Sequence, residues 1–372
     1  MTALPGKTGV LVINFGEPDE PTPGKVEPFL ERIFLQNAGL EASQAASERA
    51  KQLAKDRAPG LIEEYRRIGG SPLNTQAMAQ AEALEAELGE RGWDAKAYPA
   101  YQFTSPFVDE AVTSARADGV ERLVALPVYP ICGQSTTVAA LEAVEAALEA
   151  LEWAPAYAGV SGWHHGEAYV SMRVDNIRAF VAREGLDLSD EDTVLYFSVH
   201  GTPIKYLDEG NRYDRYVEEQ CRDVALRLGA DRYAVGFQNH TNRRIEWTQP
   251  DNEACIRERA ERRLVVEPIS FMHEQSETLA EIDHELREFI ESLGKEMHRV
   301  PVPHDSERFI GFLADLVSDV VADGAEPTRL SPCRCAPLAG VRCTNGRREL
   351  PPSAYARTRR ERASTGADAP TG

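Results

Sequence analysis

The sequence has no long hydrophobic run and little positive charge. None of its apolar stretches approaches the roughly 20 residues that a membrane-spanning helix requires. Lysine and arginine total 41 against 60 aspartates and glutamates, which gives a formal net charge of −19. Non-specific nucleic-acid binding needs a basic surface, so this acidic chain argues against it. The charge also disfavours docking on an anionic membrane, although peripheral membrane contact stays open. The simplest explanation of the charge is solubility.

Motifs of nucleotide binding and of secretion are also missing. Neither Gly-x-Gly-x-x-Gly nor Gly-x-x-x-x-Gly-Lys-Ser/Thr occurs, which weakens any interpretation that depends on a bound nucleotide. Residues 1–7 lead directly into an apolar run at 9–15, so we expect no secretory signal. We therefore expect a cytoplasmic protein, in which the six cysteines do not form structural disulfides.

Short apolar runs alternate with amphipathic segments along most of the chain. The runs that predict strands are 9–15, 97–103, 122–129, 155–160, 193–200, 232–238, 263–271 and 298–303. Helical patterns lie between them, at 77–88, 106–117, 141–151, 211–228 and 276–290. This alternation is typical of parallel sheets that helices cover on both faces. We predict an α/β fold with two similar Rossmann-like domains, each a four-stranded parallel sheet flanked by helices, and an active-site cleft between or beside them.

The length of 372 residues suits two domains of ordinary size. We expect an N-terminal α/β domain at residues 1–175 and a C-terminal α/β domain at 176–325. A cysteine-containing extension would follow at 326–350. Residues 351–372 hold few core-forming side chains, so we expect a disordered tail there.

One predicted strand ends in a histidine. His200 closes the run at 193–200 and is followed by Gly201-Thr202-Pro203. Ligands of parallel sheets bind beyond the carboxyl ends of the strands, and an imidazole there suits proton acceptance or metal ligation. The alternative is a hydrogen-bonded histidine that caps the strand.

A row of carboxylates opens the predicted helix at 276–290. Glu277, Glu281 and Glu285 recur every four residues and therefore share one helix face. Such a row could pass a hard cation or protons inward. The alternative is a solvated acidic face, as expected anywhere on so acidic a protein.

Two arginines and a group of cysteines complete the candidates. Arg66 and Arg67 precede a glycine pair and could bind a carboxylate in bidentate fashion, or could be the usual cations of a helix end. Cys333, Cys335 and Cys343 are spaced so that their thiolates can converge on a metal. A zinc site and free thiols are the alternatives.

Six motifs along the chain, in the order in which they occur, resemble those of the ferrochelatases over roughly residues 8–323. The matching motifs are residues 10–18, Ile-Gly-Gly-Ser-Pro-Leu at 68–73, Leu-Pro-Val-Tyr-Pro at 126–130 with Ser-Thr-Thr at 135–137, Ser-Val-His-Gly-Thr-Pro at 198–203, Phe-Gln at 237–238 with Trp247, and Glu-Thr-Leu at 277–279 with Glu281 and Ile282. One motif would be a weak match, but six in order are specific. The resemblance implies a lyase-class enzyme of haem synthesis that inserts ferrous iron into a porphyrin and releases two protons.

The resemblance also implies roles for single residues. His200 and Glu277 are similar to the family's catalytic pair, and Glu281 and Glu285 would extend the metal path behind them. Porphyrin contacts are expected at Arg66, Arg67, Ser71, Phe103 and Tyr129.

Some ferrochelatases carry a [2Fe–2S] cluster on three C-terminal cysteines and one internal cysteine. Cys132 resembles the internal position, with Cys333, Cys335 and Cys343 as its partners, so the resemblance implies this cofactor beside ferrous iron as substrate. Two departures from the family's pattern stand out. Glu274-Gln275 replaces an Asp-His pair, with His273 one step earlier, and Gln102-Phe103 replaces an arginine-aromatic pair, so one propionate contact is expected to be missing.

Two other functions fit these motifs. One is a chelatase for another metal or tetrapyrrole, and the other is a non-catalytic carrier of porphyrin or haem. The carrier is disfavoured, because it needs no proton acceptor opposite an acid. The sequence leaves open the choice between protoporphyrin IX and coproporphyrin III, and the oligomeric state.

Overall fold

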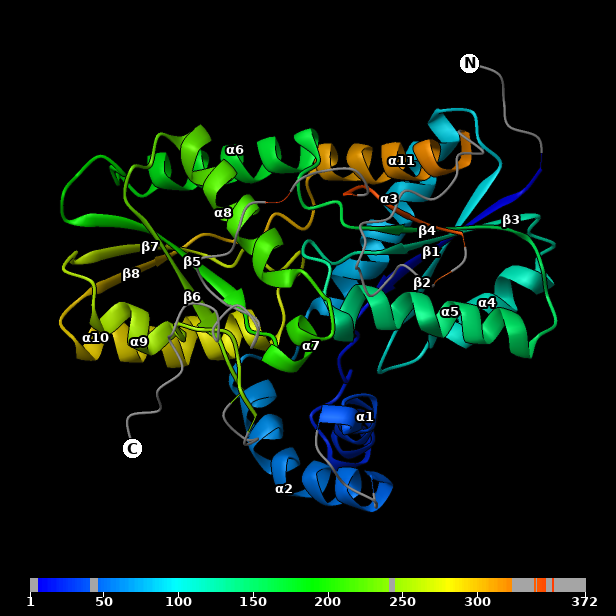
Figure 1. The fold of residues 1–372 in the computed structure, drawn as a ribbon, viewed down its shortest axis with the longest axis horizontal. Helices are drawn as coiled ribbons and strands as arrows, with labels where there is room; N and C mark the ends of the chain where they lie inside the picture. The colour runs from blue at the N-terminus through cyan, green and yellow to red at the C-terminus, as the bar shows by residue number, and fades with distance from the viewer. Residues whose placement is uncertain are drawn as a thin grey trace.

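The computed structural model describes residues 6–40, 46–240, 245–322, 338, 340–345 and 350, and within them it contains two parallel sheets that lie side by side (Figure 1). The first sheet has the order β2-β1-β3-β4-β9 and comprises β1 (Thr8–Asn14), β2 (Ala95–Tyr101), β3 (Arg122–Pro127), β4 (Ala156–Ser161) and β9 (Val341–Cys343). The second has the order β6-β5-β7-β8 and comprises β5 (Thr193–His200), β6 (Tyr233–Gln238), β7 (Arg263–Glu267) and β8 (Glu296–Arg299). The predicted α/β fold with two parallel sheets is confirmed.

The central strands are mostly apolar and almost entirely buried because helices cover both of their faces. All seven residues of β1 are buried, and so are the first seven residues of β5. On the first sheet, α3 (Leu73–Glu90) and α4 (Val108–Ala117) pack against β1 and β2, and α5 (Ala139–Ala150) packs against β3. On the second, α8 (Tyr213–Leu228) packs against β5, α9 (Asn252–Arg257) against β6 and α10 (Arg287–Ser292) against β8.

The first sheet has one strand more than predicted. β9, from the expected cysteine-containing extension, pairs in parallel with β4, with Val341 opposite Gly159 and Cys343 opposite Ser161. Three residues are too short a run to predict a strand from periodicity, and this one forms because β4 offers a free edge.

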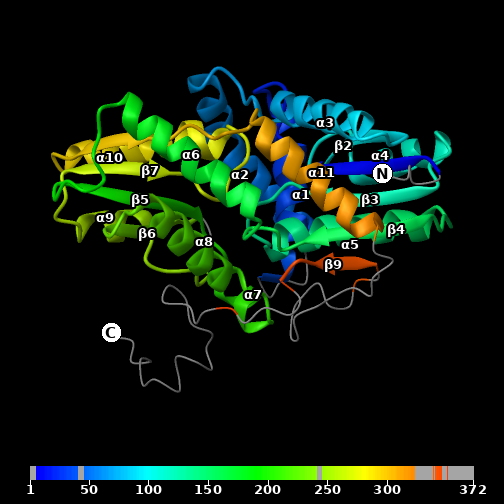
Figure 2. The ribbon, with the colours of Figure 1, turned by 90° about the horizontal axis from the view of Figure 1, so that it is seen from above.

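The domain division at residue 175 stays a prediction. Position 175 lies within α6 (Glu167–Arg183), a helix that packs against both α8 of the second sheet and α11 (Glu307–Ala322). α11 in turn packs against α3, β3 and β4 of the first sheet, although it falls in the expected C-terminal domain. Seen from above, α6 lies on the side of the second sheet and α11 on the side of the first, and the contact between the two helices links the sheets (Figure 2).

A helical hairpin projects from the two sheets (Figure 1). It consists of α1 (Pro23–Gln36) and α2 (Ala46–Arg67), which pack along each other around a small core of their own. The 3₁₀ turn η1 (Ala38–Leu40), the short helix α7 (Ile204–Asp208) and the two π-helices η2 (Gln134–Val138) and η3 (Glu277–Leu286) complete the elements. In the part of the chain described, no helix is both long and apolar enough to cross a bilayer.

Candidate active site

A cavity lies between the helical hairpin and the carboxyl ends of the strands. One wall is apolar and comes from α1 and α2, with Phe29, Leu30, Phe34 and Leu61. The facing wall is polar and comes from the segments after β1, β3, β5 and β6 and from the start of η3. Its residues include Glu17, Tyr129, His200, His240, Glu277 and Glu281. A concave site with an apolar wall and a few convergent polar groups is typical of a small-molecule site.

His200 reaches this cavity because β5 ends there. Its backbone N–H donates to Ser270 Oγ at 2.7 Å, and its carbonyl accepts from Tyr213 Oη at 2.9 Å. Nδ1 lies 2.7 Å from the carbonyl of Gly201. A carbonyl only accepts, so Nδ1 carries a proton, and Nε2 is the nitrogen that can exchange a proton or bind a metal.

Glu277 opens η3 and faces His200. Its Oε1 lies 3.1 Å from His200 Nε2, while Gln275 Nε2 donates to its Oε2. Burial alone would raise the pKa of Glu277, but the charge and hydrogen bond of His200 hold it below the ordinary value. For His200 the converse holds: burial lowers its pKa, and Glu277 raises it by more, to above the usual 6.5. The two predicted residues are therefore in direct contact on the cavity wall, and both pKa shifts favour an imidazolium beside a carboxylate.

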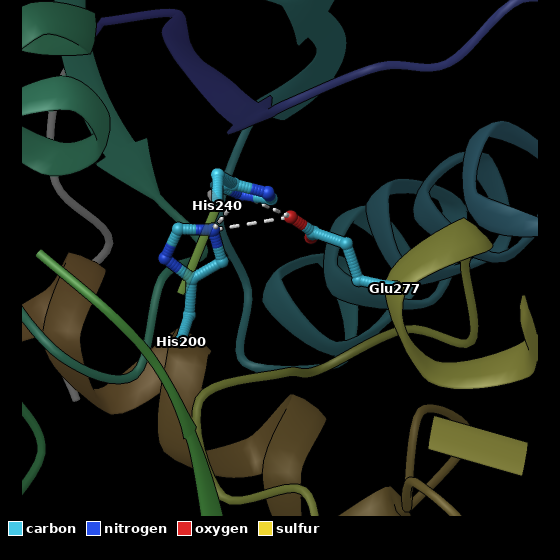
Figure 3. Close-up of side chains that lie close together, drawn as sticks. All are labelled: His200, His240 and Glu277. Carbon is cyan, nitrogen blue, oxygen red and sulfur yellow. Dashed lines mark hydrogen bonds and ion pairs between the residues drawn. The ribbon is translucent and has the colours of Figure 1, made fainter. Parts of the chain in front are cut away.

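A second histidine completes this cluster, and the sequence analysis missed it. His240 follows β6, and its Nε2 lies 3.1 Å from His200 Nε2 and 3.7 Å from Glu277 Oε1. Figure 3 shows the three side chains converging from the end of β5, the end of β6 and the start of η3. The same rule that singled out His200 applies to His240, which comes two residues after the predicted strand 232–238.

Of the predicted row of carboxylates, Glu277 and Glu281 line the cavity and Glu285 does not. Glu281 lies on the cavity wall and accepts a hydrogen bond from Gln238 Nε2. Burial and the charge of Glu277 raise the pKa of Glu281 to about 8. Glu285 is exposed and does not line the cavity. Partial desolvation of the Glu285 carboxyl and the charge of Glu64 still raise the pKa of Glu285.

Glu17, in the loop after β1, is a buried acid that the sequence analysis also missed. Its carboxylate accepts hydrogen bonds from Tyr65 Oη at 2.9 Å, from the hydroxyls of Ser71 and Ser276, and from the backbone N–H of Ser276 at 3.2 Å. Burial raises the pKa of Glu17, and the charge of Glu277 adds to this effect. This network joins the loop after β1, the end of α2 and the start of η3, and so fixes the position of Glu277.

The predicted porphyrin contacts fall into two groups. Tyr129 lies on the cavity wall and donates to Gln102 Oε1. Ser71 and Phe103 lie one layer behind, where Ser71 binds Glu17 and Phe103 packs against Phe15 at a ring-centroid distance of 4.5 Å.

Arg66 and Arg67 are not on the cavity wall. Arg66 lies 3.8 Å from Glu63, and Arg67 pairs with Glu288 on α10, with side-chain exposures of 60% and 46%. The arginine of α2 that does line the cavity is Arg57, which pairs with Glu64 at 2.8 Å. The face of α2 that packs against α1 decides which arginine points inward, and the motif alone does not reveal it.

Two of the four predicted cluster cysteines lie at the carboxyl-terminal side of the first sheet. Cys132 follows β3, and Cys343 is the last residue of β9, so both are at the carboxyl ends of parallel strands. Both are buried, with 3% and 2% of their surface exposed. Cys333 and Cys335 lie outside the described residues.

Comparison with known proteins gives a consistent result. The family model described as Ferrochelatase matches residues 7–321. A ferrochelatase of Picosynechococcus sp. is 34% identical over 331 residues, which cover 84% of this chain and 83% of the relative. A ferrochelatase of Gloeobacter violaceus is 32% identical and covers 84% of this chain and 97% of the relative. The chloroplastic ferrochelatase-2 of Arabidopsis thaliana is 33% identical, and its matched part is 63% of its own length.

Proposed function

This chain belongs to the ferrochelatase family, whose reaction is the insertion of a metal into a porphyrin in haem synthesis, and we propose that its own metal is ferrous iron. The observation that carries the proposal is the pairing of His200 Nε2 with Glu277 Oε1 at 3.1 Å on the wall of a cavity that α1 and α2 close with apolar side chains. The cytoplasm is the location we propose for it.

Metal insertion is an exchange without redox chemistry. Two pyrrole N–H bonds break, four ring nitrogens bind one Fe²⁺, and two protons leave to groups on the protein and then to water. The barrier has two parts, which are bending the flat macrocycle so that nitrogen lone pairs point outward, and removing protons while iron loses its water shell. Apolar side chains such as Phe29, Phe34 and Leu61 supply binding energy away from the reacting centre, which can support the bent ring.

The proton transfers use the polar wall. We propose that the neutral form of His200 accepts a pyrrole proton at Nε2, since Nδ1 is already committed to the Gly201 carbonyl. Glu277 stabilises the resulting imidazolium and guides metal or protons. Glu281, whose pKa is raised to about 8, holds a proton near neutral pH and can pass it on. Glu285 on the outside would end this path.

The substrate's propionates need cationic or hydrogen-bonding partners. Arg57 on the cavity wall is placed to receive one. Tyr129 is proposed as a direct contact, and Ser71 and Phe103 as supports behind the wall. Arg66 and Arg67 remain predicted contacts at the rim, and each would have to leave its carboxylate partner on α2 or α10 to reach a propionate.

The proposal is tested by anaerobic incubation of the protein with Fe²⁺ and either protoporphyrin IX or coproporphyrin III, followed by absorption spectroscopy. We expect insertion of Fe²⁺, and a rate about 10²–10⁴-fold lower in His200→Ala because a general base is lost. His298→Ala on β8, which faces Glu296 outside the cavity, is the matched control.

Each contrary result has a defined meaning. Insertion of Co²⁺ or Ni²⁺ without Fe²⁺ would favour the other chelatase, and porphyrin binding with no insertion would favour the carrier. Near-wild-type turnover in His200→Ala would reject the role of His200.

We further propose a [2Fe–2S] cluster held by Cys132, Cys333, Cys335 and Cys343. Cys132 and Cys343 are compatible with this cofactor, because both thiols are buried and both lie at the carboxyl-terminal side of parallel strands in the first sheet. Such a cluster would supply electron-transfer or structural chemistry, and none of the metal-insertion steps above depends on it.

A further inference from the structure

We propose that His240 is a third protein ligand for the incoming metal, so that His200, His240 and Glu277 bind a divalent cation before porphyrin takes it. The inference rests on the proposed function and adds to it the site from which the metal is delivered. It concerns His240, which the family resemblance does not assign, and it is argued from the distances among the three side chains.

The donor atoms are spaced as ligands of one ion. Metal–nitrogen bonds of about 2.1 Å at angles of 90–110° place neighbouring donors about 3.0–3.4 Å apart. The observed separations are 3.1 Å between the two Nε2 atoms, 3.1 Å from His200 Nε2 to Glu277 Oε1, and 3.7 Å from His240 Nε2 to the same oxygen. Small side-chain movements bring all three onto one ion.

The ligand types suit a first-row divalent metal with open coordination positions. Two imidazoles and one carboxylate are typical of Fe²⁺, Co²⁺ and Zn²⁺ sites. The three side chains keep 31%, 35% and 19% of their surface exposed, and all line the cavity. The remaining coordination positions therefore face the space in which a macrocycle would lie, so a pyrrole nitrogen can replace protein ligands one at a time.

The surrounding contacts orient the ligands. The Gly201 carbonyl fixes the ring of His200 through Nδ1, and Gln275 holds the second oxygen of Glu277. The indole of Trp247 lies against His240 with ring centroids 5.6 Å apart. Groups of this kind raise metal affinity by holding the ligands ready.

The test is a titration of the porphyrin-free protein with Co²⁺, which reports its ligands through visible ligand-field absorption. We expect one Co²⁺ per chain in the wild type, and binding weakened at least about tenfold in both His240→Ala and His200→Ala. His298→Ala is the control and should bind Co²⁺ as the wild type does. Circular dichroism and porphyrin affinity establish that each variant is folded, and His240→Asn serves as a second variant if the alanine protein is not.

A steady-state assay provides an independent measurement. Loss of a metal ligand should raise KM for Fe²⁺ in His240→Ala and leave KM for porphyrin unchanged. Wild-type Co²⁺ affinity in a folded His240 variant would overturn the inference even if the wild type inserts iron. Failure of the wild type to insert any metal would instead overturn the proposed function, whatever the Co²⁺ titration gives.

Discussion

At the residue scale, burial and a single partner decide what each ionisable side chain does. His200 and His273 are both histidines at the cavity, yet their pKa values move in opposite directions. Glu277 raises the pKa of His200, whereas burial lowers that of His273 to about 3. His273 Nε2 lies 2.7 Å from Gln80 Oε1, and the amide nitrogen of Gln80 already donates to the His304 carbonyl at 2.7 Å. His273 Nε2 must therefore donate to Gln80 Oε1, and the neutral imidazole carries the one proton that this hydrogen bond needs.

His273 should make the protein less stable in acid. Its folded-state pKa is about 3, against 6.5 when unfolded, so between these values the unfolded chain binds one more proton than the folded chain. The free energy of unfolding should then fall as pH drops below 6.5, by about 1.4 kcal/mol per pH unit from this residue. Denaturant unfolding of wild type and His273→Gln at pH 7, 6 and 5 gives the free energy of unfolding as a function of pH. The same dependence on pH in the two proteins would contradict the prediction. His298→Gln is the control.

At the element scale, one buried ion pair joins α6 to β7. Arg173 on α6 pairs with Glu267, the last residue of β7, at 2.7 Å, and neither side chain has any exposed surface. Arg173 also donates to Tyr169 Oη at 3.2 Å and to the carbonyl of Phe271. Phe271 lies in the segment that leads from β7 into η3, so the pair fixes the approach to Glu277. Burial raises the pKa of Glu267 to about 7, although Arg173 opposes the shift.

Arg173→Met should destabilise the fold by about 3–5 kcal/mol, because it leaves a buried carboxylate without its partner. The loss should be smaller at pH 6 than at pH 8, since Glu267 can then be neutralised by a proton. The double variant Arg173→Met with Glu267→Gln should recover much of the stability. Arg178→Ala on the same helix removes a pair with Asp175 that is more than half exposed, so it should cost at most about 1 kcal/mol. Urea unfolding at both pH values compares the four proteins, and a pH-independent loss in Arg173→Met would contradict this account.

At the scale of the whole molecule, the chain returns to its first sheet after completing the second. α11 packs on the first sheet, and β9 then extends that sheet beside β4. This return brings Cys343 to the carboxyl-terminal side of the sheet, the side on which Cys132 follows β3, although the two cysteines are more than 200 residues apart in the sequence. The proposed cluster would therefore link the C-terminal extension to the N-terminal sheet.

The cluster predicts a visible absorption spectrum in the freshly purified protein, together with two iron atoms and two sulfides per chain. Cys132→Ser and Cys343→Ser should each abolish the spectrum, because a thiolate ligand is lost. Cys255→Ser on α9 is the control and should leave it intact. Bound zinc without sulfide would indicate a zinc site, and a metal-free protein would indicate free thiols; either result would reject the cluster.

The fold class and the order of eight strands follow from the sequence, because both depend on local periodicity. The pairing of His200 with Glu277 was expected only from the resemblance to a family, since position and spacing left both residues open. The sequence did not reveal His240, Glu17 or Arg57, and it did not show that Arg66 and Arg67 pair with carboxylates outside the cavity wall. Those outcomes depend on which strand ends are neighbours and on which face of α2 packs against α1. β5 and β6 are adjacent in the sheet, so His200 and His240 meet, although 40 residues separate them along the chain. Such contacts depend on how whole elements pack, which local sequence patterns do not encode.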